Sequence, residues 1–390
     1  DFKAEIKADG KVLQTINIDD ISVETHTGKL IRIPLKNITF QDNTEYFVEF
    51  STTTKKEWGI LSKGFEVAHE QIPLTSKFKK VISESEAITN LNVQNNQDQV
   101  TVSNEHLSLV FDKNEGRITS YLINGTELLK DENGPKPNFW RAVTDNDFGN
   151  QMDEKNIEWK QASLESTVKY FDYKILKNGS IVLEVTLHLT GVETTFTTNY
   201  TIFGNGVVHI KNTLDETTYE GDIPRIGMRL QLPKTYANLS YFGRGPWENY
   251  QDRKASAFVD VYNSKVSEQY VPYIRPQDNG YKTDTRWIAV SNEQNNGLLF
   301  VSDSENHLSF SALHMENEDF DTTLGLDYKN SNKSKHTIDI KEKDLVQLNI
   351  DLGQRGVAGD DSWHSKPMEK YQFKGNQSHT YSFFMIPFEN

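Results

Sequence analysis

Alternation of apolar and polar residues with a period of two is the feature that most constrains this chain. It is clearest at Ile181, Leu183, Val185, Leu187 and Leu189, and it recurs at Leu107, Leu109 and Phe111. This spacing places the apolar side chains on one face of a strand. Asn-Gly or Asp-Gly pairs, which favour hairpin turns, stand at 9–10, 124–125, 178–179, 205–206 and 296–297. The pattern predicts an all-β fold of antiparallel strands, without a helix of three turns and without a repeat of fixed period.

Two β domains are expected from the order of these segments. Strand-like runs at 3–6, 12–16, 29–35, 46–50 and 65–68 give the beginning of the chain the content of one small sandwich. A polar stretch follows, and strands resume at Val100. We therefore place a first domain at 1–82, a linker at 83–100 and a large second domain at 101–390.

Composition excludes several classes of function. Asp and Glu number 56 against 42 Lys and Arg, so the net charge is −14. This surplus argues against a nucleic-acid partner and against docking on an anionic membrane. Cysteine is absent, which removes disulfides, thiolate metal sites and cysteine nucleophiles together. No apolar run approaches the roughly 18 residues of a membrane span.

Two polar, aromatic stretches are too dense to be ordinary turns. Residues 138–149 (NFWRAVTDNDFG) contain three consecutive oxygen ligands, but the calcium-loop pattern fails, and capping by Asx side chains is the favoured interpretation. Residues 241–253 (YFGRGPWENYQDR) combine glycines with Trp247 and Arg244. An aromatic face beside polar groups suits a sugar. A structural corner with internally paired charges is the alternative.

Three further stretches carry candidate chemistry. Residues 273–287 (YIRPQDNGYKTDTRW) offer arginines that bind a carboxylate or form internal salt bridges. In 313–319 (LHMENED), a strand would place His314, Glu316 and Glu318 on one face, as a metal site, an acid/base pair or, by default, a solvated polar face. Residues 356–364 (GVAGDDSWH) put a tryptophan in a Gly-rich turn, as a core plug or a stacking platform. The nucleotide-binding, zinc-protease and serine-hydrolase motifs are absent, and no glycosidase carboxylate pair can be chosen among 56 acids.

Four of these stretches together resemble one family. Residues 139–149 look like the R-A-P-x-D-N-D-x-G segment of the large bacterial β-galactosidases of glycoside hydrolase family 2, and 243–253 look like their G-x-G-P-x-E-N-Y-x-D-R. Residues from Tyr273 to Gly280 are similar to P-Y-x-x-P-x-E-N-G, with Asp278 where Glu is usual. Residues 356–363 are similar to G-x-G-G-D-D-S-W, with Ala358 in place of a glycine. The motifs keep the family's order between residues 139 and 363, and the resemblance covers essentially the whole chain.

The resemblance implies an accessory part of a five-part enzyme. Its catalytic (β/α)₈ barrel needs βα alternation, which this sequence lacks. The two predicted domains match the last two parts: an immunoglobulin-like sandwich, then a large β super-sandwich that resembles galactose mutarotase. The start of the chain, in what reads as a strand without a leader, suggests a fragment. We therefore expect no catalytic residue here and no hydrolysis of galactosides by this chain alone.

Residue roles follow from the resemblance only where motifs match. Trp363 inherits stacking on the substrate at the mouth of the barrel. The positions of a mobile loop beside the active site fall on Gly149, Asn150, Gln151, Met152 and Asp153, although the residues after Gly149 match poorly. Arg244 and Trp247 remain candidate sugar contacts from their residue types. The family's Mg and Na ions belong to the barrel, so no metal is expected here.

Partners and alternatives complete the expectations. The resemblance implies β-galactosides bound through the parent active site, contacts with the chain's own barrel domain, and homo-oligomer contacts. A carbohydrate-binding module, with Trp247 or Trp363 as its platform, is one alternative. An aldose 1-epimerase is another, because that chemistry needs a His acid and a carboxylate base, and His307, His314 and Glu316 are the nearest candidates. The compartment, bacterial periplasm or cytoplasm, stays open.

Overall fold

The chain divides into two compact units. The computed structural model describes residues 1–18, 21–35, 38–75, 90–219, 221–303, 306–322, 329, 335–361 and 363–389, so residues 83–89 of the expected linker lie outside the described part. The first unit holds the described residues up to 75 together with 258–261, and the second holds the remainder. In the described residues, no helix combines the length and the apolar character that crossing a membrane requires.

The first unit is built on one antiparallel sheet with the strand order β2-β1-β3-β4. Its strands are β1 (Phe2–Ala8), β2 (Lys11–Ile18), β3 (Tyr46–Thr53) and β4 (Glu66–Pro73). The prediction of a strand at 29–35 is wrong, because that segment pairs with no strand. Ile33 packs on the small core of the sheet, whereas Leu30 is 90% exposed. The segment therefore contributes a side chain to the face of the sheet without adding a backbone ladder.

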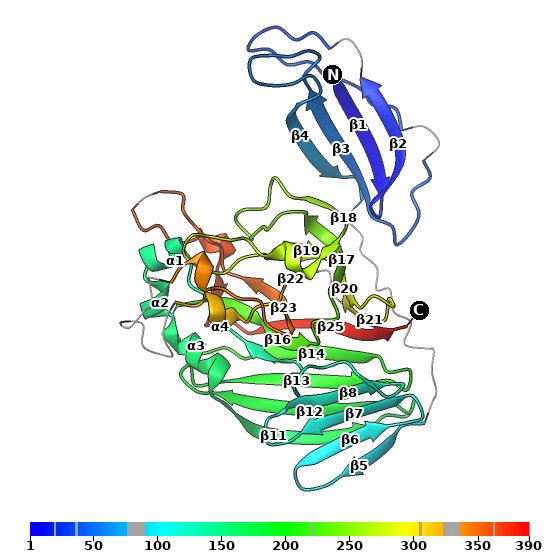
Figure 1. Ribbon diagram of the computed structural model, residues 1–390, viewed down its shortest axis with the longest axis vertical. Helices are drawn as coiled ribbons and strands as arrows, with labels where there is room; N and C mark the ends of the chain where they lie inside the picture. Colours follow the sequence, from blue (N-terminus) through cyan, green and yellow to red (C-terminus); the bar gives the residue numbers. More distant parts are fainter. Residues whose placement is uncertain are drawn as a thin grey trace. The chain divides into compact units, whose positions relative to one another are not determined.

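An antiparallel sheet of nine strands dominates the second unit (Figure 1), and the first four residues of its last strand, 258–261, are the ones grouped with the first unit. In spatial order they are β11 (Ser166–Ile175), β12 (Ile181–Leu189), β13 (Thr194–Ile202), β14 (Val208–Leu214), β25 (His379–Phe388), β21 (Gly297–Ser302), β20 (Trp287–Ser291), β17 (Asn238–Gly245) and β18 (Phe258–Lys265). Strand β25 lies between β14 and β21, so it joins two halves of the sheet that are distant in sequence.

Two five-stranded sheets and one two-stranded sheet complete the unit. One consists of β5 (Asn92–Asn95), β6 (Gln99–Ser103), β7 (Leu107–Asp112), β8 (Arg117–Ile123) and β9 (Thr126–Glu127). Another consists of β10 (Lys136–Asn138), β16 (Arg225–Leu232), β23 (Val346–Gln354), β22 (Leu308–Leu313) and β19 (Lys282–Thr285). The smallest pairs β15 (Asp222–Ile223) with β24 (Phe373–Lys374). The end of the expected linker is thus corrected, because β5 and the start of β6 lie within it.

Helices are short in the described residues. They are α1 (Asp145–Gly149), α2 (Met152–Lys155), α3 (Ile157–Leu164), α4 (Asn317–Phe320) and the 3₁₀ turns η1 (Val266–Gln269), η3 (Thr337–Asp339) and η4 (Glu369–Tyr371). The longest of these, α3, has 8 residues. This agrees with the predicted lack of a three-turn helix and confirms the all-β fold class.

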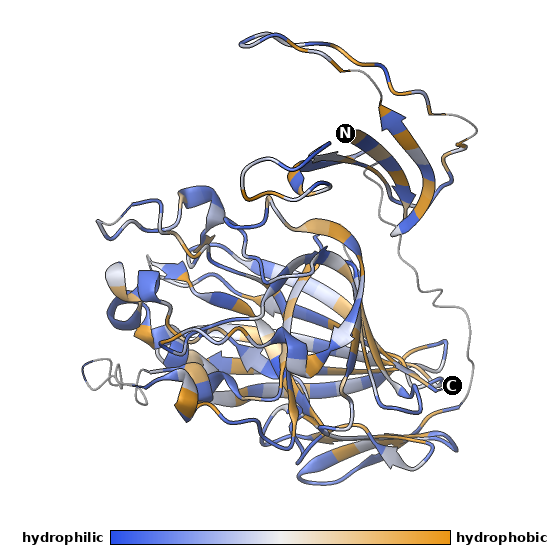
Figure 2. Cartoon of the chain, turned by 45° about the horizontal axis from the view of Figure 1, so that its top comes forward, coloured by the Kyte–Doolittle hydropathy of each residue, from blue (hydrophilic) through white to orange (hydrophobic). Residues whose placement is uncertain are grey.

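The predicted hairpins and alternation are present. Each of the five Gly turns joins two strands that pair antiparallel: β1–β2, β8–β9, β11–β12, β13–β14 and β20–β21. Strand β12 buries the predicted Ile181, Leu183, Val185, Leu187 and Leu189. Figure 2 shows alternating hydrophobic and hydrophilic bands along many strands. One face of these strands therefore supplies the core.

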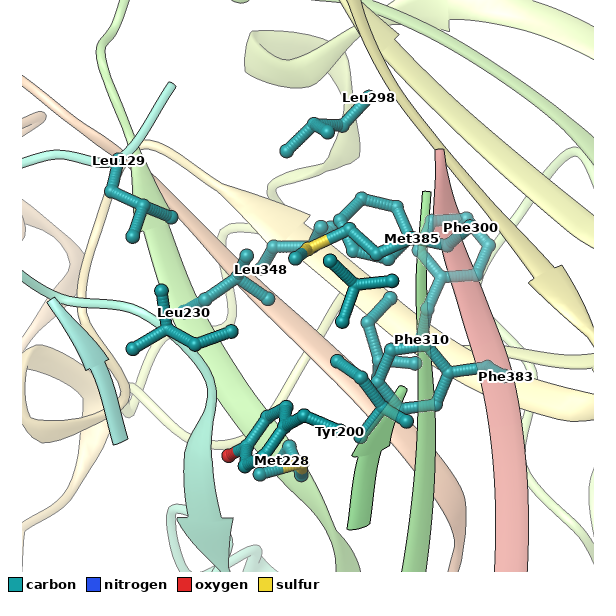
Figure 3. Packing of buried hydrophobic residues seen from close by; sticks show 14 of the residues in the cluster. Leu129, Tyr200, Met228, Leu230, Leu298, Phe300, Phe310, Leu348, Phe383 and Met385 are labelled. Carbon is teal, nitrogen blue, oxygen red and sulfur yellow. The ribbon is translucent and has the colours of Figure 1, made fainter. Parts of the chain in front are cut away.

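The core joins the nine-stranded sheet to both five-stranded sheets. Phe111 of β7 stacks on Phe171 of β11 with 5.1 Å between ring centroids, and meets Tyr200 of β13 at 5.7 Å. Figure 3 shows residues of the large sheet, such as Phe383, beside Phe310 of the second small sheet. Removing this apolar surface from water is the main favourable term for such a fold. The loops at the edge of these layers carry the sequence motifs.

Candidate functional site

A buried ion pair anchors the first motif. The Nε and Nη2 atoms of Arg141 donate to the two carboxylate oxygens of Asp147, at 3.0 and 2.8 Å, and both side chains are fully buried. Asp147 also accepts the backbone N–H of Thr144, whose hydroxyl accepts the N–H of Asp147. Burial alone would raise the pKa of Asp147, but Arg141 and Arg355 outweigh it and lower that pKa. The favoured capping interpretation of this stretch therefore agrees with the structure, since Asp147 and Thr144 form a capping box at α1.

Arg141 also fixes the start of the Gly-rich turn at 356–364, here called the tryptophan loop. Its Nη1 donates to the carbonyl of Arg355 at 2.7 Å, and its Nη2 donates to that of Gly356 at 3.0 Å. The Arg355 side chain reaches back and donates to Asn150 Oδ1 at 2.8 Å. Two arginines thus tie the tryptophan loop to the end of α1.

The second motif holds the same loop from another direction. The Asp252 carboxylate accepts the backbone N–H groups of Val357 and Ala358 at 2.9 and 2.8 Å. A Cβ on Gly356 would collide with that carboxylate, so glycine is the residue that permits the contact. Ala358, which stands where the family pattern has glycine, adopts a φ of 55°. These contacts therefore fix the backbone conformation at the base of the tryptophan loop.

The third motif packs under the first two. Asp278 Oδ1 lies 3.2 Å from Arg225 Nη2, and its Oδ2 accepts the Tyr250 hydroxyl at 3.3 Å. Burial raises the pKa of Asp278 despite the nearby Arg225 and Arg141. Arg275 forms an ion pair with Asp145. Arg275 of this stretch thus forms an internal salt bridge, as one of the two interpretations of the stretch proposed.

The tip of the tryptophan loop contrasts with this base. Trp363 is 84% exposed, and its backbone N–H donates to Asp361 Oδ1 at 2.7 Å. The neighbouring His364 lies beside the end of α1, with its Nδ1 3.3 Å from the position of a Cβ on Gly149. Trp363 is therefore exposed and is not a core plug, and its use as a stacking platform stays a prediction. The tryptophan loop, from the last motif, thus lies beside Gly149 at the end of α1, from the first motif.

The segment expected as a loop at 149–153 is a junction of two short helices. Gly149 ends α1, Asn150 caps it, Gln151 adopts a left-handed conformation with φ 64°, and Met152 and Asp153 begin α2. Asn150, Met152 and Asp153 are buried. These positions therefore lie in and between two short helices, and a mobile loop beside an active site at this place stays a prediction. Gly149 is half-buried and Gln151 is exposed to solvent.

Arg244 and Trp247 lie in different environments. The Nε of Arg244 lies 2.5 Å from Asp284 Oδ2, and its Nη1 donates to the carbonyl of Ala257 at 2.7 Å. This guanidinium is thus held within the protein. Trp247 is 51% exposed and follows a cis peptide bond between Gly245 and Pro246. Of these two predicted sugar contacts, Trp247 presents its side chain to solvent.

Residues 313–319 do not form the strand that would place His314, Glu316 and Glu318 on one face. Strand β22 ends at Leu313, Glu316 is the N-cap of α4, and Glu318 lies inside that helix. His314 is buried and bonds the carbonyl of Leu345 at 2.8 Å, while the two glutamates pair with Lys343 and Arg229. A capping box at Glu316 ends the strand geometry, so the three side chains do not share a strand face.

The epimerase candidates are also separated. His307 lines a cavity of about 630 Å³ whose described lining includes neither His314 nor Glu316. Within the described residues, no group of three His, Asp or Glu side chains is arranged to hold a metal ion.

Sequence reasoning missed Arg225, Asp222, Asp351 and Arg355. Arg225 lies 3.2 Å from both Asp278 and Asp351, and burial raises the pKa of Asp351 to about 7 against the effect of Arg225. Arg355 Nη1 lies 2.9 Å from Asp222. Charged residues in buried strands were the available signal for Arg225 and Asp351, while Arg355 stands directly before the Gly-rich turn.

This arrangement is an all-β architecture in which residues of separate motifs hold the loop that carries the exposed Trp363. A family model described as Beta galactosidase small chain matches residues 103–385, and one described as Beta-galactosidase, domain 4 matches residues 1–75. The chain belongs to the β-galactosidase small-chain family. This result confirms the resemblance that the four motifs carried.

Relatives named β-galactosidase are much longer than this chain. The one from Priestia megaterium is 34% identical over 349 residues, which are 89% of this chain and 32% of the relative. That from Streptococcus thermophilus is 24% identical over 387 residues, covering 99% of this chain and 36% of the relative. Among solved structures, the galactose 1-epimerase from Lactobacillus acidophilus NCFM has a TM-score of 0.44 and 7% identity, covering 77% of this chain and 98% of that one. This chain thus spans about a third of the length of the two β-galactosidases.

Proposed function

We propose that this chain is a non-catalytic portion of a β-galactosidase and completes the sugar site of the intact enzyme with Trp363. The observation that carries the proposal is the contrast between a tryptophan that is 84% exposed and a loop base held by Arg141 and Asp252. A large exposed indole is suited to stacking on the C–H face of a sugar. The longer relatives named β-galactosidase supply the substrate class, β-galactosides.

The carboxylates around the tryptophan loop support a non-catalytic role. Hydrolysis of a glycoside needs two carboxyl groups that flank the scissile bond. Asp147 and Asp278 are buried in ion pairs, Asp252 binds backbone N–H groups, and Asp145 pairs with Arg275. These four groups are committed to holding the structure. On this proposal the acid, the nucleophile and the Mg and Na ions belong to the barrel of the intact enzyme, and this portion also contributes contacts to the barrel and to a homo-oligomer.

A chimaera tests the role of Trp363 directly. This chain replaces the matched third of the Priestia megaterium β-galactosidase, and steady-state hydrolysis of a chromogenic galactoside is compared for the unsubstituted chimaera, Trp363→Ala and Trp363→Phe. We expect Trp363→Ala to lower kcat/KM several-fold to about tenfold, since loss of about 1.4 kcal/mol is a factor of ten. Trp363→Phe retains part of the stacking and falls between.

A matched control removes an exposed aromatic elsewhere. Tyr170 on β11 is 47% exposed, and Tyr170→Ala is expected to leave kcat/KM unchanged. Equal kinetics for Trp363→Ala and Tyr170→Ala would exclude a sugar-site role for Trp363. The chain alone is assayed in parallel, and turnover by the purified chain would overturn the non-catalytic assignment.

A further inference from the structure

A cavity of about 630 Å³ in the second unit is lined by His307, but by neither Trp363, Arg244, Trp247 nor residues 149–153. It lies where η4 and β24 approach the beginnings of β22 and β25. His307 precedes β22, His379 begins β25, and Tyr371 and Phe373 come from the η4–β24 segment. Its volume is within the roughly 300–1,000 Å³ typical of small-molecule sites.

Aromatic rings form the apolar part of this cavity. Phe373 meets the ring of His379 edge-on, with 5.7 Å between centroids. A Cβ on Gly353 would come within 2.8 Å of Phe373 Cζ, so the glycine allows this ring to seat against β23. The Lys370 ammonium lies 4.7 Å from the centroid of the Tyr371 ring. Aromatic faces framed by polar groups suit a ligand with both C–H and hydroxyl surfaces.

Neutral donors and acceptors form the polar part. His379 Nε2 lies 2.8 Å from the carbonyl of Lys374, which only accepts, so Nε2 carries a proton. The Gln251 Oε1 accepts from Lys254 at 3.2 Å, while its Nε2 donates to no group in the described part of the chain. The cavity therefore presents an unused amide donor of Gln251 together with the imidazole of His379, and a sugar hydroxyl can both accept and donate hydrogen bonds.

The charges of the lining exclude other ligand classes. Asp284 lies 2.5 Å from Arg244 and 2.8 Å from Lys254. Burial alone would raise the pKa of Asp284, but the two cations outweigh burial and lower that pKa. Its charge is therefore neutralised locally. Lys370 contributes one ammonium, which does not make an anion site, and the amides and imidazoles disfavour a purely apolar ligand.

We propose that this cavity binds a neutral saccharide, with Tyr371 and Phe373 as the apolar contacts and Gln251 and His379 as the polar ones. The proposal does not depend on the role of Trp363. It adds a sugar-binding site to a chain whose relatives are named for the sugar they release.

Calorimetric titration of the full 390-residue chain tests the proposal, with galactose, glucose, lactose and inorganic phosphate as separate probes. We expect at least one sugar to bind with a dissociation constant in the millimolar range or tighter, and phosphate not to bind. Tyr371→Ala and Gln251→Leu each weaken that binding about tenfold, which corresponds to about 1.4 kcal/mol. Tyr170→Ala on β11 is the matched control and binds as the unsubstituted chain does.

Further measurements separate the outcomes. Near-ultraviolet circular dichroism checks that each variant keeps its packing. If Tyr371→Ala disturbs the fold, Gln251→Leu still tests the site, because this substitution preserves side-chain volume. Absence of sugar binding in the unsubstituted chain, or preference for phosphate, overturns the proposal. Sugar binding that is lost in Trp363→Ala but kept in Tyr371→Ala also overturns it and assigns the binding to the tryptophan loop.

Discussion

The base and the tip of the tryptophan loop follow opposite physical rules. At the base, Arg355 is 1% exposed, and the charged side chains of Arg141 and Asp252 bind backbone groups of the loop. At the tip, Trp363 is 84% exposed and makes one local hydrogen bond. Buried charges tolerate little change because each must keep its partner. The comparison teaches that the motifs encode the support, while a single residue carries the surface that the support presents.

Breaking the buried pair at the base is expected to have the largest effect. Arg141→Met removes both hydrogen bonds that the Arg141 guanidinium donates to the buried Asp147 and leaves Arg355, 3.7 Å away, as its cationic partner. It should reduce the free energy of unfolding by about 3 kcal/mol, the lower end of the range for breaking a buried pair. Urea denaturation of the second unit, followed by tryptophan fluorescence, measures the change. Lys265→Ala is the control, because its partner Glu293 is largely exposed, and should cost no more than about 1 kcal/mol. Equal stabilities for the two variants would show that the pair does not hold the base.

Asp351, on the buried strand β23, should make the free energy of unfolding depend on pH. The pKa of Asp351 is raised to about 7 by burial, so between its unfolded value and 7 the folded state binds more protons than the unfolded state. This group therefore makes stability fall as pH rises across that window, on the order of 1 kcal/mol per pH unit. Asp351→Asn should remove this contribution in urea titrations from pH 5 to 7. An unchanged pH dependence would contradict the assignment.

Crowding the base sterically should have a moderate effect. Gly356→Ala introduces a methyl group against the Asp252 carboxylate and should cost about 1–3 kcal/mol, the usual penalty for overpacking. Gly28→Ala is the control, because Gly28 has open space around it and no positive φ. Gly179 also has open space, but its positive φ makes it unsuitable. Gly28→Ala should change the unfolding free energy little. Thermal denaturation distinguishes the two.

Changing the tip should have the smallest effect on stability. Trp363→Ala removes an exposed side chain with one backbone hydrogen bond nearby, so the free energy of unfolding should change by no more than about 0.5 kcal/mol. The same urea titrations measure it. A loss of more than about 2 kcal/mol would mean that the indole packs on the protein, and the distinction between base and tip would fail.

Local patterns predicted the strands well and the support poorly. The alternation in β12 and the Gly turns depend only on neighbouring residues, so the sequence suffices for them. The pairing of Arg141 with the backbone at 355–356 joins residues more than 200 positions apart, which no local pattern encodes. The failure at 29–35 has the same origin, since an alternating segment becomes a strand only if a neighbour offers its backbone.

The placement of β25 has a consequence for biosynthesis. This strand lies between β14 and β21, and its residues, 379–388, are translated after all the other strands of the large sheet. Until they emerge from the ribosome, the two halves of that sheet expose their inner edges to solvent and to other chains. The large sheet therefore closes only after the synthesis of its other strands is complete. A nascent chain that stalls before residue 379 would be a substrate for chaperones rather than a partly assembled domain.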